Sequence, residues 1–169
     1  MIALVGPPGS GKTTVGAALA ERLGTDFIDH DAAVAGRHGD IAGIVLDDGP
    51  DRLATLQADL LEELAGADVV LAVGSAALDD PRSARALRGA VVVHLAADLA
   101  HTFPRSGLNR PQPPGLVGAR QLWARLLAER DAAYRAVADH VVEVGDLTVD
   151  EVVDAVFVLL PTGGPGELG

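Results

Sequence analysis

One stretch of this sequence decides its fold: Gly6-Pro7-Pro8-Gly9-Ser10-Gly11-Lys12-Thr13. The stretch matches G-x-x-x-x-G-K-[ST], the pattern of a phosphate-binding loop. An apolar run, Ile2–Val5, precedes it and predicts a buried strand, while apolar residues at helical spacing follow it from Thr13 to Leu23. A glycine-rich turn that only joins a strand to a helix is the simpler alternative. Because the loop lies between a strand and a helix, we expect the chain to bind a nucleoside triphosphate.

The residue types of this loop suit an anion. Glycines allow backbone N–H groups to turn inward without a Cβ in the way, and the helix start adds free N–H groups and a partial positive charge. In this pattern Lys12 reaches the β- and γ-phosphates, and the hydroxyl of Thr13 binds Mg²⁺. The expected nucleotide contacts are Gly9, Ser10, Gly11, Lys12, Thr13 and Thr14.

The composition limits the possible partners. The chain has 169 residues, of which 49% are hydrophobic, so one well-buried domain is expected. Its formal net charge of −11 argues against nucleic acid or an anionic membrane as the main partner, because both are bound through Lys and Arg. Cysteine is absent, which excludes disulfides and thiol catalysis. Since there is no signal pattern and no apolar run of about 18 residues, we expect a cytoplasmic protein. We also expect a monomer.

Short apolar runs alternate with amphipathic stretches along the chain. Buried strands are expected at Ile2–Val5, Phe27-Ile28, Val69–Val73, Val91–Leu95 and Val141–Val144. Helices are expected over about 13–23, 51–65, 80–88, 119–138 and 149–159, the last of them capped by Thr148. Residues 32–48 show mixed helical and loop signals. The alternation predicts an α/β fold with a parallel sheet of about five strands, whose ligands bind beyond the carboxyl ends of the strands.

Residues 103–118 form a long stretch without periodicity. They include four prolines and three glycines, and a loop of this length in a compact domain is typical of an active-site lid or of disorder. We expect a mobile lid, from which Arg105 or Arg110 could stabilise charge on a transferring phosphoryl group. The Pro- and Gly-rich residues 161–169 are expected to form a disordered tail.

Two carboxylates, Asp29 and Asp31, follow the predicted second strand. Beside a phosphate loop, one can hold Mg²⁺ through water, and the other can accept a proton from an attacking hydroxyl. The alternative is a helix-capping acid followed by a solvated one. His30 lies between them and is expected to face the opposite side of the strand. The histidines of the chain show no metal-ligand spacing, so no zinc site is predicted.

Several motifs occur in a specific order. The opening Lys12-Thr13-Thr14-Val15-Gly16 … Phe27-Ile28-Asp29-x-Asp31 is followed by Arg110-Pro111 and by Glu129-Arg130-Asp131-Ala132-Ala133-Tyr134. In this combination they resemble the shikimate kinase family, and the resemblance extends from Met1 to about Leu160. It implies a P-loop kinase fold in a single domain, residues 1–160, with an acceptor-binding region at about 32–65 and the lid at about 103–118.

The resemblance implies roles on the nucleotide side of the site. Lys12 and its loop would bind the phosphates of ATP, and Lys12 would act in catalysis. Thr13 would bind Mg²⁺, with Asp29 assisting through water. Arg110 would act on the phosphoryl group from the lid as a catalytic residue, and Arg105 would stack on adenine.

The resemblance also implies roles on the acceptor side. Asp31 would contact the acceptor hydroxyl as a catalytic residue, and Arg130 would hold the carboxylate of the acceptor. The family has three consecutive glycines after the central strand, which let the backbone approach the acceptor ring. This chain has Gly74-Ser75-Ala76 there, so we expect Gly74 and Ser75 to contact the acceptor and the two added side chains to crowd it or to offer one new hydroxyl.

A second departure from the family lies between residues 53 and 57. The family has a phenylalanine-arginine pair, with a glutamate three residues after the arginine, and the arginine is a main anchor of the shikimate carboxylate. This chain has Leu53-Ala54 and Gln57 at those places. Arg52 is no obvious substitute, because two positions along a helix turn it to another face. The nucleotide half of the site therefore matches the family, whereas the acceptor half is altered.

Three functional hypotheses follow. The first is an ATP- and Mg²⁺-dependent kinase that phosphorylates a hydroxyl of a small metabolite, either shikimate or a related cyclitol or hydroxy acid. The second is a nucleotide-binding homologue with weak or no kinase activity and a regulatory or partner role. The third is another P-loop kinase that acts on a nucleotide or a sugar acid. Nucleotide kinases commonly need more cations in the lid than this chain offers.

Overall fold

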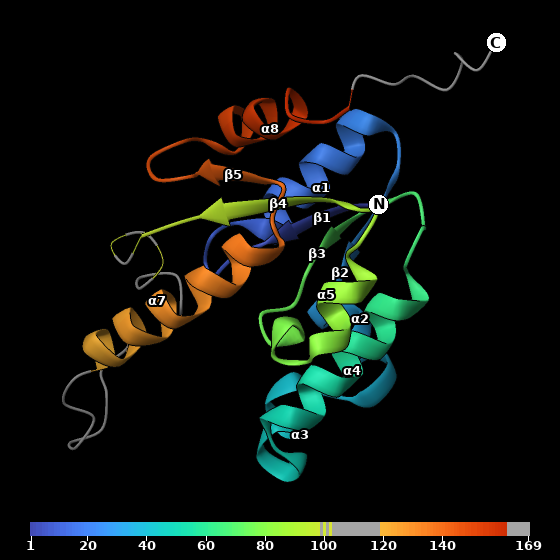
Figure 1. The fold of residues 1–169 in the computed structure, drawn as a ribbon, viewed down its shortest axis with the longest axis vertical. Coiled ribbons are helices and arrows are strands. Elements are labelled where there is room, and N and C mark those ends of the chain that lie inside the picture. Colours follow the sequence, from blue (N-terminus) through green and yellow to red (C-terminus); the bar gives the residue numbers. More distant parts are fainter. Residues whose placement is uncertain (99, 101, 103–118, 162–169) are drawn as a thin grey trace.

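A parallel sheet forms the centre of the molecule (Figure 1). The structure, a computed structural model, describes residues 1–98, 100, 102 and 119–161. Over these residues the sheet has five strands in the order β2-β3-β1-β4-β5, and every neighbouring pair is parallel. The strands are β1 (Ile2–Val5), β2 (Asp26–Asp29), β3 (Val69–Ala72), β4 (Val91–Ala96) and β5 (His140–Glu143).

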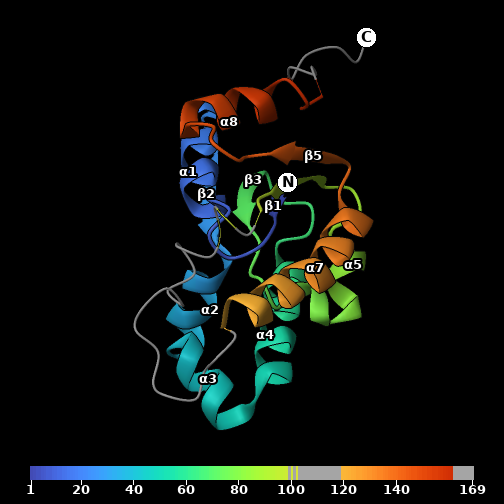
Figure 2. The same ribbon diagram turned by 90° about the vertical axis from the view of Figure 1, so that its left-hand side faces the viewer.

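Helices cover both faces of this sheet (Figures 1 and 2). The described helices are α1 (Lys12–Leu23), α2 (His30–His38), α3 (Ile41–Asp48), α4 (Pro50–Glu63), α5 (Pro81–Ala86), α7 (Ala119–Val137) and α8 (Val149–Phe157), with a short 3₁₀ helix, η1 (Ala77–Asp79). Helices α1 and α8 pack on one face, and α4, α5 and α7 contribute to the core on the other. In the described ranges, no helix has the length and apolar character needed to span a membrane.

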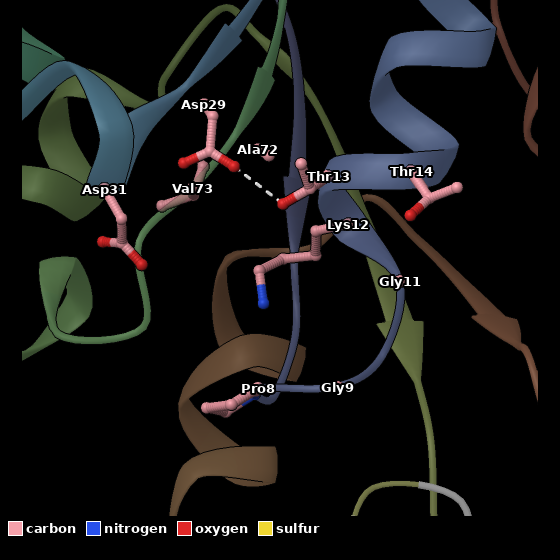
Figure 3. A pocket seen from close by; sticks show the side chains of 10 residues that line it. All are labelled: Pro8, Gly9, Gly11, Lys12, Thr13, Thr14, Asp29, Asp31, Ala72 and Val73. Atoms are coloured by element: carbon pink, nitrogen blue, oxygen red, sulfur yellow. Dashed lines mark hydrogen bonds between the residues drawn. The ribbon is translucent and has the colours of Figure 1, made fainter. Parts of the chain in front are cut away.

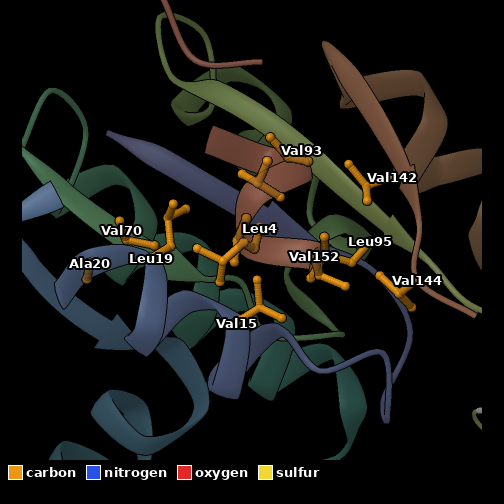
Figure 4. Packing of buried hydrophobic residues seen from close by; sticks show 12 residues of the cluster. Leu4, Val15, Leu19, Ala20, Val70, Val93, Leu95, Val142, Val144 and Val152 are labelled. Carbon is orange, nitrogen blue, oxygen red and sulfur yellow. The ribbon is translucent and has the colours of Figure 1, made fainter. Parts of the chain in front are cut away.

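Alternating side chains of each strand build a separate core on each face of the sheet. In β1, Leu4 faces α1 and α8, whereas Ala3 and Val5 pack on the opposite face. Figure 4 shows the first cluster, in which Val15 of α1 and Val152 of α8 lie against the strands. Aromatic residues make up only 3% of the chain, so aliphatic side chains fill most of this space.

The predicted α/β fold and its five strands are confirmed in the described part of the chain, and each strand end differs by at most one residue. Helix α1 ends as predicted, because Gly24 adopts a left-handed φ of 67° and its N–H bonds carbonyl groups of the last turn. Helix α8 begins after Thr148, whose side chain caps it together with Glu151.

Two local predictions need correction. Residues 30–48 form two short helices, α2 and α3, and Asp29 and Asp40 cap their first turns. His30 is therefore the first residue of α2 and not a strand residue on the opposite face. The predicted lid, 103–118, and the predicted tail, 161–169, lie outside the described residues apart from residue 161.

The buried clusters predict where truncation is costly. Leu19 of α1 is 0% exposed in the first cluster, whereas Leu46 of α3 is 84% exposed. We expect Leu19→Ala to lower the free energy of unfolding by about 2–5 kcal/mol, because it removes buried methyl groups and leaves a cavity. Leu46→Ala is the matched control and should change it by less than about 0.5 kcal/mol. Urea unfolding followed by circular dichroism measures both, and equal losses would contradict this core.

Candidate active site

The phosphate loop joins the carboxyl end of β1 to the first turn of α1. Gly11 precedes the helix with a φ of 92°, a left-handed conformation that favours glycine. Gly6 approaches the backbone of β4 so closely that a Cβ would lie 2.6 Å from the carbonyl oxygen of Leu95. The loop therefore lies directly on the edge of the sheet, where its N–H groups and the start of α1 can meet an anion.

Lys12 reaches back over this loop. Its Nζ donates hydrogen bonds to the carbonyl oxygens of Gly6, at 2.7 Å, and Pro7, at 3.0 Å. Burial lowers the pKa of Lys12 to about 8, although the charges of Asp31 and Asp29 act in the opposite direction. Figure 3 shows this amine between the loop and the two carboxylates. A phosphate group that replaced the two carbonyl partners would stabilise the charged amine.

Asp29 links β2 to the phosphate loop. Its Oδ2 accepts a hydrogen bond from the Thr13 hydroxyl at 2.7 Å (Figure 3). Its Oδ1 accepts one from the N–H of Ala32 at 3.0 Å. The carboxylate thus caps α2 and also accepts a hydrogen bond from Thr13, so the helix-capping alternative is confirmed, and the Mg²⁺ role of Asp29 stays a prediction. A hydroxyl and a carboxylate oxygen are hard donors that suit Mg²⁺, which usually keeps several waters and binds phosphate oxygens as well. The described residues hold no cluster of three or more His, Cys, Asp or Glu side chains that could bind a metal ion.

Asp31 lies in the first turn of α2 and is not simply solvated. Its Oδ1 accepts a hydrogen bond from Nε2 of Gln57, which is buried on α4. The pKa of Asp31 is raised, mainly by burial and then by the charge of Asp29, while Lys12 acts to lower it. A carboxylate in such a place is a better proton acceptor than one in water.

These side chains share one pocket. A cavity of about 290 Å³ lies at the carboxyl ends of β1, β2 and β3. Its lining combines the phosphate loop with both carboxylates: Pro8, Gly9, Gly11, Lys12, Thr13, Thr14, Asp29, Asp31, Ala72 and Val73 (Figure 3). Most of the predicted nucleotide and catalytic residues in the described chain are therefore brought together, although Ser10 is buried at 3% exposure and does not line the cavity.

Arg130 of α7 lies beside the loop Gly74–Ala76 and outside the lining of this cavity. Its guanidinium donates to the carbonyl oxygen of Ser75 and, at 2.8 Å, to Oδ2 of Asp79. The loop Gly74–Ala76 is thus tied to α7 through the Ser75 carbonyl, and the cation is already paired with a carboxylate. Arg105 and Arg110, the predicted adenine and phosphoryl contacts, lie outside the described residues.

Two of the altered positions of α4, Leu53 and Ala54, face a hydrophobic cluster. Ala54 is 4% exposed and packs with Val34, Ile44 and Ala76. The small side chains at 54 and 76 therefore belong to one hydrophobic cluster between α4 and the loop Gly74–Ala76. Arg52 is exposed on the helix, as its two-residue offset from Ala54 predicts.

Sequence reasoning missed two contacts of this site. Gln57 bonds Asp31, and Nδ1 of His30 accepts a hydrogen bond from the N–H of Gly74 at 3.2 Å. Burial lowers the pKa of His30 to about 4, against smaller opposite effects of the Gln57 backbone and Asp29, so the ring is neutral and Nδ1 can accept. A signal for Gln57 was present, because a glutamine between Leu53 and Leu60 at helical spacing is polar on an apolar face.

Comparisons with known proteins agree with this arrangement. The shikimate kinase family model matches residues 8–160. The chain is 39% identical to a shikimate kinase of Streptomyces coelicolor over 157 residues, 92% of each chain. It is 42% identical to a shikimate kinase of Halorhodospira halophila over 149 residues, which cover 84% of this chain and 82% of that one.

A solved structure extends the likeness to three dimensions. The shikimate kinase from Acinetobacter baumannii, solved in complex with shikimate, has a TM-score of 0.84 and 32% sequence identity, and the match covers 94% of this chain and 90% of that one. The resemblance carried by the sequence motifs and the P-loop kinase fold are both confirmed. This chain belongs to the shikimate kinase family.

Proposed function

We propose that this chain transfers the γ-phosphoryl group of ATP to a hydroxyl group of shikimate. Family membership makes it a phosphotransferase with an alcohol acceptor. The observation that carries the proposal is the shared pocket, which places Lys12 and Thr13 of the phosphate loop opposite Asp29 and Asp31. The single kinase domain would comprise residues 1–160, with residues 32–65 around the acceptor and residues 103–118 as the lid.

The phosphate loop binds and orients the nucleotide. Lys12 leaves the carbonyl oxygens of Gly6 and Pro7 and pairs with the β- and γ-phosphates. Thr13 and Asp29 would hold Mg²⁺, which when bound supplies positive charge beside the phosphate oxygens. Arg110 would add positive charge from the lid, and Arg105 would stack on adenine.

Asp31 receives the proton in the transfer step. The acceptor hydroxyl oxygen forms a bond to the γ-phosphorus, and the bond from that phosphorus to the bridging oxygen breaks, so that its electron pair leaves with ADP. The hydroxyl proton passes to the carboxylate of Asp31, whose pKa burial has raised. The proton returns from Asp31 to solvent when the product leaves.

The acceptor is held by fewer cations than the family pattern provides. Arg130 would bind the acceptor carboxylate in exchange for Asp79, and Gly74 and Ser75 would lie against the ring. Ala54 supplies no charge. Loss of one charged hydrogen-bond partner costs roughly 1.5–3 kcal/mol, so we expect weaker shikimate binding than two arginines would give.

A coupled assay of ADP release tests the proposed reaction. We expect shikimate-dependent release of ADP that Asp31→Asn lowers by on the order of a hundredfold or more, because the carboxylate that accepts the proton is lost. Related cyclitols and hydroxy acids are assayed in parallel. ADP release with one of these compounds and not with shikimate would identify that compound as the acceptor in place of shikimate. No acceptor-dependent ADP release despite ATP binding would overturn the kinase function in favour of a nucleotide-binding role.

Calorimetry of shikimate binding to the complex with an ATP analogue reports on the acceptor site separately. Micromolar affinity would show that other residues replace the missing arginine. Millimolar affinity would show that Ala54 weakens the site as expected.

The lowered pKa of Lys12 predicts a pH dependence of nucleotide binding. The amine is charged below its pKa of about 8 and neutral above it, and only the charged form attracts phosphate. We therefore expect ATP affinity to fall by about tenfold from about pH 7 to about pH 9. Isothermal titration at the two pH values measures it. Lys12→Met should bind ATP weakly at both, and an unchanged pH dependence in that variant would assign the effect to another group.

Two arginines of α7 provide a test of the acceptor site: Arg130 is the residue tested, and Arg125 is its control. Arg130 lies beside Ser75, whereas the Arg125 side chain is 79% exposed and pairs with Glu129. We expect Arg130→Met to raise the KM for shikimate by about tenfold or more and to change the KM for ATP by less than about twofold. Arg125→Met should leave both unchanged in the same steady-state assay. Equal effects of the two substitutions on the KM for shikimate would show that Arg130 does not bind the acceptor.

A further inference from the structure

A buried amide holds one oxygen of the Asp31 carboxylate. Gln57 is 1% exposed on an otherwise apolar face of α4, and its Nε2 donates a hydrogen bond to Asp31 Oδ1. An amide is costly to bury unless it is hydrogen-bonded, and a bond to a charged acceptor is stronger than one between neutral groups. In the described chain no hydrogen bond reaches Asp31 Oδ2, so the two oxygens of this carboxylate have different surroundings.

Gly74 leaves the space that this amide occupies. A Cβ at Gly74 would overlap Gln57 Nε2 and would lie 2.5 Å from Asp31 Oδ1. The backbone of Gly74 is itself fixed, because its N–H donates to Nδ1 of His30, whose ring is 0% exposed. The end of β3, the start of α2 and the middle of α4 therefore meet around one contact between two side chains.

We infer that Gln57 is a positioning residue for phosphoryl transfer: it fixes Asp31 Oδ1, so that Oδ2 is the oxygen that receives the proton of the acceptor hydroxyl. Asp31 lines the pocket, whereas Gln57 is not among its lining residues, so Gln57 acts through Asp31 and not on the acceptor. The role of Asp31 rests on the proposed function. The hydrogen bond between Gln57 and Asp31 does not rest on the proposed function, and crystal structures of wild type and variant test it without turnover.

The side-chain oxygen of Gln57, Oε1, allows a substitution that separates the role of the hydrogen bond from the stability of the fold. This oxygen is buried and has no hydrogen-bond partner among the described residues. Methionine has nearly the same length and shape, and it suits a helix. Gln57→Met therefore removes the bond to Asp31 together with a buried polar atom that nothing satisfies, so the fold should lose little stability while the carboxylate loses its partner.

The first experiment compares turnover with stability. We expect Gln57→Met to lower kcat by about ten- to a hundredfold, to change the KM for ATP by less than about twofold and to leave the thermal midpoint unchanged or raised. In an Asp31→Asn background the same substitution should have no further effect on kcat. The matched control is Thr25→Ala, outside residues 32–65, whose hydroxyl bonds the carbonyl of Asp68, and it should keep the wild-type kcat.

Several results would overturn the inference. A lowered thermal midpoint with an unchanged kcat per folded molecule would give Gln57 a structural role alone. Additive losses in the double variant would show that Gln57 does not act through Asp31. Gln57→Leu serves as the second variant if Gln57→Met does not fold: it offers Asp31 no hydrogen-bond donor and should lower kcat, and a kcat equal to the wild type would reject the inference.

Crystal structures supply a readout that does not need turnover. We expect the Asp31 side chain to adopt one rotamer in the wild type, with Oδ1 on Gln57, and a different or mixed rotamer in Gln57→Met. An identical single rotamer in both would overturn the inference even if the enzyme is active. A wild type without acceptor-dependent ADP release, combined with the expected change of rotamer, would instead reject the proposed function and retain the orienting contact.

Discussion

The register of the parallel sheet is the constraint on which the rest of the site depends. Ala72 of β3 pairs with Leu4 of β1 on one side and with Asp29 of β2 on the other. The three strands therefore end at one level, and the Thr13 hydroxyl after β1 meets the Asp29 carboxylate after β2 at 2.7 Å. Cores on both faces hold this register, because a slip of one residue would turn every apolar side chain of a strand to the wrong face.

The proposed acceptor side of the site is organised by pairing between polar groups. Arg130 bonds Asp79 and the Ser75 carbonyl, and Gln57 bonds Asp31. An amide is well suited to the space beside Asp31 when residue 54 carries no positive charge. A second buried carboxylate there would repel the first, whereas the N–H of an amide attracts it. Ala54 and Gln57 are thus consistent with each other as well as different from the family pattern.

The strands and long helices could be predicted because each carries its own periodicity. Leu4 alternates with Ala3 and Val5, and Thr148 precedes the apolar face of α8. Helices α2 and α3 could not be predicted as such, because glycines and polar residues interrupt the helical spacing over residues 32–48 and mix helical with loop signals. The placement of His30 was wrong because the boundary between β2 and α2 falls one residue before it, at Asp29.

By itself, the sequence determined the α/β class, the phosphate loop with Lys12 and Thr13, and the absence of a cation at Ala54, since these are local patterns or single residues. Only the tertiary structure decided which polar groups meet. Gln57 lies 26 residues from Asp31, His30 lies 44 from Gly74, and Arg130 lies 51 from Asp79. Contacts over such separations depend on how α4, α7 and the end of β3 pack together, and no local pattern encodes that packing.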